Sequence, residues 1–149
     1  IVQTKINYLL LSIFIIFIDQ FTKYLMFYNY KFLLNMDFII FRLDFVKNYG
    51  AAFSIFNGSR LFLSSISIIF SLIIFYLILR KSFSNEIELY SYSFILGGTL
   101  GNGIDRVLNG FVIDFINLNF IKFPVFNIAD ISINIGLALI LYRILKINR

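Results

Sequence analysis

The 149-residue chain contains no histidine, no cysteine and no tryptophan, and Pro124 is its one proline. Without cysteine it forms no disulfide and has no thiol nucleophile. Without histidine it lacks the base of a Ser-His-Asp triad and the imidazole ligands of a typical zinc site. Hydrolytic chemistry on this chain is therefore left to carboxylates, a serine-lysine pair or a metal held by other ligands.

Charge is scarce as well, since 14% of the residues are charged, 60% are hydrophobic and the mean hydropathy is +0.88. An ordinary soluble domain is about 45–50% apolar. Residues 61–79 carry no charge at all. As a helix they would extend about 28 Å, close to the thickness of a bilayer core of about 30 Å. This stretch predicts a membrane-spanning helix.

Three further segments are candidates for membrane helices. They are residues 7–27, which Asp19 and Lys23 interrupt, residues 89–106, which are rich in glycine, and residues 128–145, which begin beside Asp130. The first segment is expected to be retained rather than cleaved, because charges interrupt its apolar run and no small-residue cleavage site follows. We expect an all-α membrane protein with four transmembrane helices in a single domain, residues 1–149, with outer loops at about 28–60 and 107–127.

The first outer loop contains a short pattern typical of a strand. Polar and apolar residues alternate over 42–45, and a turn is predicted at 48–50. We therefore expect a small extracytoplasmic β/loop element lying on the membrane surface. An amphipathic interfacial segment is the alternative.

The formal net charge of +5 and the isoelectric point near 9.5 do not indicate nucleic acid. No basic cluster has the aromatic interleaving or the recognition helix that such a partner needs. The basic residues instead crowd the segments on one side of the predicted membrane: Lys5, Arg80, Lys81, Arg143, Lys146 and Arg149. By the positive-inside rule this side is cytoplasmic, so both termini are expected inside the cell.

Ionisable residues near the predicted outer face gather at one depth: Asp19, Lys23, Asp105, Arg106, Asp114 and Asp130. Such a group within a span costs roughly 2.5–3.5 kcal/mol, so it is expected to face a partner or a wet cavity. For Asp105 and Arg106, an ion pair at a helix end is the alternative. Asp114 and Asp130 fit that reading poorly, because their neighbours are apolar. A further set of basic residues fits interfacial anchoring instead: Lys31, Arg60, Arg80, Lys81 and Lys122.

Two neighbouring aspartates are sufficient to activate water. At about 4 Å and an effective dielectric constant near 20, their repulsion is roughly 4 kcal/mol, or about 3 pH units. One of them therefore keeps its proton at neutral pH, and the pair serves as acid and base. For Asp114 and Asp130 this requires contact across sixteen residues, which the turn-forming Asn117, Asn119 and Pro124 would allow.

Glycines give the third predicted helix a small-residue face that lets another helix approach closely: Gly97, Gly98, Gly101 and Gly103. These residues also belong to one of five motifs, which are DQFTK (19–23), NYGAAFSIF (48–56), GGTLGNGIDRV (97–107), GFVIDF (110–115) and FPVFNIADISINIG (123–136). In this order the motifs resemble those of the lipoprotein signal peptidases, the signal peptidase II family of bacterial inner membranes. The resemblance covers almost the whole chain. It departs at Thr99, Gly103 and Phe123, where the family usually has alanine, a larger apolar residue and tryptophan.

The resemblance implies an aspartyl endopeptidase that removes the signal peptide from diacylglyceryl-modified prolipoproteins, cutting just before the lipidated cysteine. It assigns catalysis to Asp114 and Asp130. Residues expected to shape the site or bind substrate are Asp19, Lys23, Asn48, Gly50, Ala51, Gly98, Gly101, Asn102, Asp105, Arg106, Asn127 and Ala129. The resemblance further implies no metal or other cofactor, inhibition by globomycin-type cyclic peptides, and contact with membrane lipids. The expected state is a monomer in the bacterial cytoplasmic membrane with its active site at the outer face.

Three other functions would use the same kinds of residue. A proton or ion carrier would use the aspartates as a relay, but their clustering at one face argues against a path through the membrane. A presenilin-like intramembrane aspartyl protease would need its two acids on facing spans. A serine-lysine peptidase using Ser54 has no defined spacing to Lys47 or Lys23.

Overall fold

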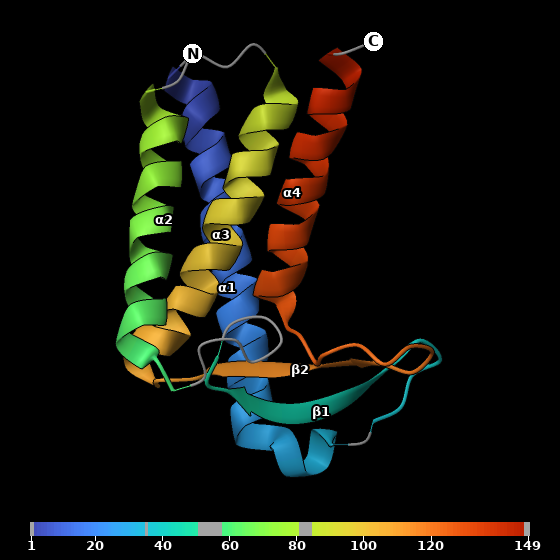
Figure 1. The fold of residues 1–149 in the computed structure, drawn as a ribbon. Coiled ribbons are helices and arrows are strands. Elements are labelled where there is room, and N and C mark those ends of the chain that lie inside the picture. Colours follow the sequence, from blue (N-terminus) through green and yellow to red (C-terminus); the bar gives the residue numbers. More distant parts are fainter. Residues whose placement is uncertain (1, 35, 51–57, 81–84, 148–149) are drawn as a thin grey trace.

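The computed structural model describes residues 2–34, 36–50, 58–80 and 85–147. Over these ranges the elements are α1 (Val2–Leu33), β1 (Phe41–Asn48), α2 (Arg60–Arg80), α3 (Glu86–Leu108), β2 (Val112–Leu118) and α4 (Ile128–Ile147). The helices run side by side, and the strands cross one end of the bundle, opposite the start of α1 (Figure 1). All four predicted helices form, although α1 continues to Leu33 rather than ending near residue 27.

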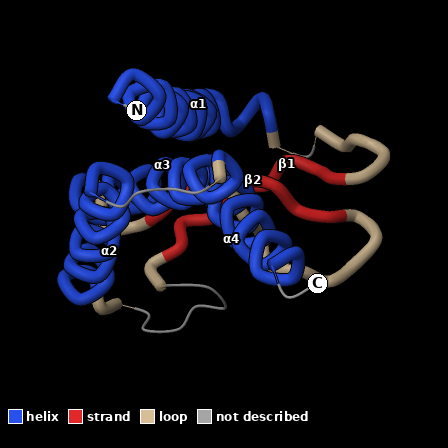
Figure 2. Tube along the Cα trace, turned by 90° about the horizontal axis from the view of Figure 1, so that it is seen from above, coloured by secondary structure: helices blue, strands red, loops and turns tan. Residues whose placement is uncertain are grey.

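The central element is α3, which contacts α1, α2 and α4 (Figure 2). Two of its glycines make this possible. A Cβ atom on Gly98 would overlap the backbone oxygen of Ala129 in α4, and one on Gly101 would lie 2.6 Å from Oδ2 of Asp19 in α1. The predicted close packing around this helix is therefore confirmed.

Three helices in the described part of the chain are long and apolar enough to cross a membrane: α1 from Lys5, α2, and α4 up to Lys146. α3 is not among them, because Glu86, Glu88 and several glycines and serines lower its hydropathy. Its location accounts for this composition. Protein covers much of its surface, so α3 does not need apolar side chains all round. By length and composition, three of the four expected spans are thus identified.

The strands form a two-stranded antiparallel sheet with a register shift between Leu43 and Val46. The predicted strand in the first loop is confirmed and extends over the whole of β1. The sequence prediction assigns no strand to the outer loop at about 107–127, whereas residues 112–118 form β2. Residues 112–115 are all buried, and all but Asp114 are apolar, so this strand lacks the polar–apolar alternation that identifies a half-exposed strand.

Candidate active site

Asp114 lies in the middle of β2, outside the candidate membrane spans. Side chains alternate along a strand, and here Val112, Asp114 and Leu118 line a cavity. The intervening Ile113 and Phe115 belong to a core cluster formed with a methionine of α1. The apolar face therefore anchors the strand on the bundle, and the opposite face presents one carboxylate.

The partner strand, β1, supplies the first hydrogen-bond donor to the carboxylate of Asp114. Asn48 pairs with Val112 in the sheet register, which places it diagonally across from Asp114. Its Nδ2 atom donates to Oδ2 of Asp114 at 2.9 Å, and its Oδ1 atom accepts from the backbone N–H of Gly50 at 2.9 Å. The asparagine thus closes the predicted turn at 48–50 and orients the aspartate at the same time.

The chain between the two aspartates returns along β2. The backbone N–H of Ile116 donates to the Phe126 oxygen at 2.8 Å, and the N–H of Phe126 donates to the Ile116 oxygen at 3.1 Å. This pairing places Asn127 beside Asp114. It is the backbone pairing, rather than the asparagines of the loop alone, that closes the sixteen-residue separation.

The loop asparagines have another role. Nδ2 of Asn117 donates to Oδ2 of Asp44 at 2.6 Å, and Nδ2 of Asn119 donates to Oδ1 of Asp37 at 2.6 Å. Both bonds connect the β2 side of the sheet with the segment around β1. They hold the far end of the sheet together, away from the aspartate dyad, Asp114 and Asp130.

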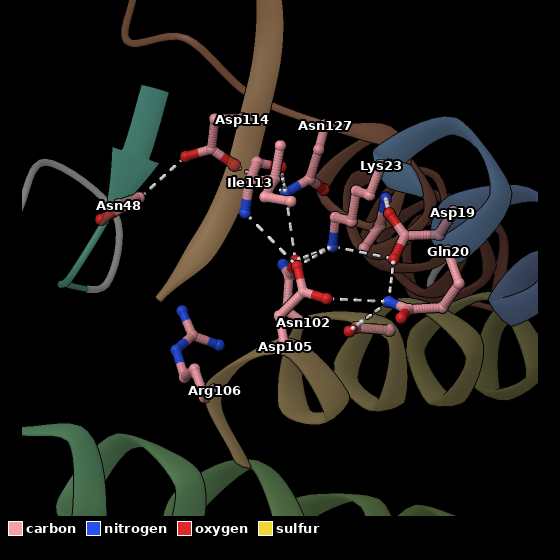
Figure 3. A network of polar contacts seen from close by, with 12 residues as sticks. Asp19, Gln20, Lys23, Asn48, Asn102, Asp105, Arg106, Ile113, Asp114 and Asn127 are labelled. Carbon is pink, nitrogen blue, oxygen red and sulfur yellow. Dashed lines mark hydrogen bonds and ion pairs between the residues drawn. The ribbon is translucent and has the colours of Figure 1, made fainter. Parts of the chain in front are cut away.

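Asn127 connects the two aspartates directly. It lies among the polar side chains near Asp114 and Lys23 (Figure 3). It precedes α4, and its Oδ1 accepts from the backbone N–H of Asp130 at 3.0 Å while Oδ2 of Asp130 accepts from its backbone N–H at 3.1 Å. This reciprocal arrangement is a capping box at the start of the helix. Nδ2 of Asn127 donates to Oδ1 of Asp114 at 2.6 Å. One asparagine therefore holds both carboxyl groups at the same place.

Asn102 of α3 holds the second aspartate from the other side. Its Nδ2 donates to Oδ1 of Asp130 at 2.8 Å. Its Oδ1 accepts from Nζ of Lys23 at 2.9 Å and from Nδ2 of Asn127 at 3.1 Å. Because both ends of its carboxamide are engaged, the orientation of Asn102 is determined by the network.

Lys23 is the buried cation at the base of this network, with 2% of its side chain exposed. Its Nζ lies 2.8 Å from Oδ2 of Asp19 and 3.0 Å from Oδ2 of Asp105. Asp19 accepts in turn from the backbone N–H of Ala129 at 2.9 Å, and Asp105 from that of Ile113 at 3.3 Å. The ion pairs therefore connect α1 and α3 to the residues next to both members of the dyad.

Arg106 follows Asp105 but points elsewhere. In the described residues Asp105 pairs with Lys23, so the proposed ion pair between the two adjacent residues is replaced by a pair between helices. Nη2 of Arg106 donates to the Gly50 oxygen at 3.3 Å and Nη1 to Oγ of Ser67 at 3.5 Å. Its Nε is buried and has no hydrogen-bond partner among the described residues. The guanidinium also lines the cavity.

The dyad opens into a cavity of about 780 Å³. One part of its wall is polar and carries the two aspartates, Asn102 and Arg106. Another part is apolar, and its side chains come from the loop before α4 and from α4 itself: Ile121, Phe123, Val125, Phe126, Ile131 and Ile133. Such a cavity fits a ligand that is polar at one end and apolar along its length.

The surroundings of Asp114 favour its protonated form. Burial is the largest cause and the charge of Asp130 the next, and together they raise the pKa of Asp114 from its ordinary value of 3.8 to about 7. Hydrogen bonds from Asn48 and Asn127 and the charge of Lys23 oppose this shift. A carboxyl group with this pKa is half protonated near neutral pH, as general acid-base catalysis requires.

The structure brings together all but one of the site residues that the sequence predicts. Gly98, Gly101 and Ala129 lie where α3 meets its neighbours, and Ala51 lies outside the described residues. The sequence prediction missed Gln20, whose Nε2 donates to Asp19, to the Gly101 oxygen and to Asp105 at 3.1–3.2 Å. Gln20 could have been predicted as a site residue, because it lies inside the DQFTK motif between Asp19 and Lys23. No group of three potential metal-ligating side chains occurs in the part of the chain that is described.

The chain is similar to known proteins over most of its length. A family model for signal peptidase (SPase) II matches residues 11–146. Lipoprotein signal peptidases of Gloeothece citriformis and Francisella tularensis subsp. mediasiatica are 41% and 35% identical over 127 and 147 residues. The alignments cover 83% and 93% of this chain and 79% and 91% of those relatives.

Two solved bacterial membrane enzymes, determined by the in meso method at 2.3 and 1.9 Å resolution, share the fold. Their TM-scores are 0.85 and 0.83, at 34% and 35% sequence identity. Each comparison covers 94% of this chain, and 88% and 93% of the respective enzyme. The family model, the relatives and the shared fold lead to one conclusion: the chain belongs to the signal peptidase II family, the lipoprotein signal peptidases.

Proposed function

We propose that this chain cleaves diacylglyceryl-modified prolipoproteins just before the lipidated cysteine, and that Asp114 and Asp130 are the catalytic pair. Its family removes signal peptides from lipoproteins, and its apolar helices are those of a bacterial membrane protein. The observation that carries the proposal is the position of Asn127, which hydrogen-bonds both carboxyl groups that line one cavity.

The chemistry follows from the different surroundings of the two acids. Asp114 holds the proton, because burial and the charge of Asp130 raise its pKa to about 7. Asp130 takes a proton from a water molecule, and the resulting hydroxide attacks the scissile carbonyl carbon while Asp114 donates its proton to the carbonyl oxygen. As the C–N bond breaks, Asp130 gives its proton to the leaving amine, and the hydroxyl group formed from the carbonyl oxygen returns its proton to Asp114, so both acids regain their starting states. The amide donors of Asn48, Asn102 and Asn127 keep both carboxyl groups oriented during this exchange.

The cavity supports a lipid-modified substrate. Its polar wall surrounds the dyad, and its apolar wall extends along α4 as far as Ala138, which belongs to a candidate membrane span. Acyl chains anchored in the membrane would lie along the apolar wall and deliver the scissile bond to the dyad. Such positioning lowers the entropic cost of bringing the substrate to the catalytic groups. Arg106, with a buried and unengaged Nε, is placed to bind the substrate backbone.

We also propose that α3 crosses the membrane within the bundle, giving four spans in one domain. Contacts at the helix ends support this: Lys5 donates to the Leu79 oxygen at 2.9 Å, and Arg143 lies 3.7 Å from Glu88. The start of α1, the end of α2, the start of α3 and the end of α4 therefore share one end of the bundle. This end is basic and is assigned to the cytoplasm, and the sheet and dyad to the outer face. Because one chain supplies the whole described network, the site needs no second copy.

Cleavage by purified variants tests the dyad. Wild type, Asp114→Asn and Asp130→Asn are incubated with a diacylglyceryl-modified prolipoprotein, and Asp44→Asn serves as the matched control because this sheet carboxylate does not line the cavity. We expect wild type and the control to cleave, and both dyad variants to be inactive while remaining folded. Activity in EDTA and inhibition by globomycin are expected for wild type. Full activity of either dyad variant would refute the mechanism.

A further inference from the structure

Asn134 lies one helical turn beyond Asp130 on α4 and lines the same cavity. Four residues along a helix correspond to a rise of about 6 Å and a rotation of about 40° past a full turn, so the two side chains share one face. Asn134 is also within the candidate membrane span of α4. It therefore presents a carboxamide to the cavity at a greater membrane depth than the dyad.

The other polar side chains of the cavity already have partners. Oγ of Ser67 donates to the Leu63 oxygen at 3.0 Å, and Oγ1 of Thr99 donates to the Ile95 oxygen at 2.8 Å. The asparagines beside the dyad donate to its carboxyl groups. Asn134, whose side chain is exposed, has no hydrogen-bond partner within the described residues. Its two N–H donors are thus available to a molecule that enters the cavity.

An unpaired carboxamide at this depth is costly. The residues that line the cavity around it are apolar, with Ile133 and Ile135 on either side and Ala138 one turn further. A polar group in such surroundings loses its hydrogen bonds to water unless another partner replaces them. Polar residues that face a cavity within a span are accordingly candidates for ligand contact rather than for helix stability.

We propose that Asn134 donates a hydrogen bond to a carbonyl oxygen of the bound substrate and so contributes to substrate selection. This inference rests on the proposed function. Two carbonyl sources reach this depth: the glycerol esters of the lipid-modified cysteine and the peptide groups of the signal sequence. Either would satisfy the carboxamide. The contact is made on binding, before the dyad acts, so it affects the affinity for substrate more than the chemical step.

The test compares two synthetic prolipoprotein substrates of the same sequence, one with ester-linked acyl chains and one with ether-linked alkyl chains, which lack the ester carbonyls. The enzymes are wild type, Asn134→Leu and Asn134→Ser, which keeps a shorter donor. The control is Leu137→Ala, a change at an exposed residue of α4 that does not line the cavity. KM and kcat are measured for each pair, together with thermal midpoints.

With the ester substrate we expect Asn134→Leu to raise KM about three- to tenfold, the effect of losing one neutral hydrogen bond, with kcat nearly unchanged. Asn134→Ser is expected to recover part of this loss. If the loss occurs only with the ester substrate, the bond is made to an ester carbonyl; an equal loss with both substrates assigns it to a peptide carbonyl. Asn134→Leu with wild-type KM on both substrates would overturn the inference. If wild type cleaves neither substrate, the proposed function itself fails.

Discussion

The raised pKa of Asp114 predicts that the folded protein loses stability as the pH rises, and that Asp114→Asn removes this dependence. In the folded state the carboxyl group keeps its proton up to a pH of about 7, whereas in the unfolded state it releases it near 3.8. The contribution to stability is therefore fully present below pH 3.8 and lost as the pH rises through 7.

The magnitude follows from linkage. Each pH unit between the two pKa values is worth about 1.4 kcal/mol, so between pH 5 and pH 8 wild type is expected to lose about 2.5 kcal/mol through this one group. For a chain of this size the loss corresponds to about 5–10 °C in the thermal midpoint. Asparagine does not titrate, and the variant lacks this component at every pH.

The substitution has a second effect that does not depend on pH. Both oxygens of Asp114 accept amide hydrogen bonds, from Asn48 at 2.9 Å and from Asn127 at 2.6 Å. Asparagine has a single oxygen, so one of these bonds is lost at a cost of about 1 kcal/mol. The informative quantity is therefore the difference in slope between the two proteins, not the difference at one pH.

Thermal melting in detergent micelles at pH 5, 6, 7 and 8 measures this slope. Asp44→Asn is the matched control and is expected to follow wild type, because the dyad is unchanged. Parallel curves for wild type and Asp114→Asn over the whole range would refute the assignment of a raised pKa to this residue, and with it the reason for making Asp114 the proton donor.

Three further outcomes are expected. Cleavage by wild type should decline above a pH of about 7, approaching tenfold per pH unit in kcat/KM, because Asp114 then loses the proton that the mechanism uses; a flat profile from pH 6 to 9 would contradict this. Lys23→Met should destabilise the fold by about 3–5 kcal/mol in denaturant titration, since it leaves two buried carboxylates without their cation. Gly98→Ala should lower the free energy of unfolding by about 1–3 kcal/mol, because its Cβ would overlap backbone in α4. Gly103→Ala should lower it clearly less, since its Cβ would meet only the Cβ of Ser67 at 3.2 Å. Equal thermal midpoints for the two variants would count against this packing.

The sequence predicts this fold well wherever local pattern carries the information. The uncharged run at 61–79 corresponds to α2 with one more residue at each end, and the alternation at 42–45 lies within β1. Both features follow from the surroundings of each segment. A helix in lipid needs an apolar run, and a half-exposed strand needs alternating polar and apolar residues, so both can be recognised from the local sequence. The order of the five motifs likewise points to the family without any knowledge of contacts.

Local pattern fails at β2, and the reason is burial on both faces. Ile113 and Phe115 pack on α1, and Val112 lies against the cavity wall, so no alternation remains to be read. The capping box formed by Asn127 and Asp130 is also a local feature, and the sequence prediction does not include it. Asp130 is interpreted there as a catalytic acid and not as part of a helix cap.

What the sequence by itself determined is an apolar helical membrane chain, its family, and the acids that are candidates for its site. What only the tertiary structure decided is how those acids are distributed. Lys23 forms ion pairs with the carboxylates of α1 and α3, and backbone pairing along β2 places Asp114 and Asp130 on one asparagine. The pair of Lys23 with Asp19 follows from their spacing of four residues on α1. The pair of Lys23 with Asp105 and the meeting of Asp114 with Asp130 depend on contacts between residues far apart in the chain, and no spacing rule encodes them.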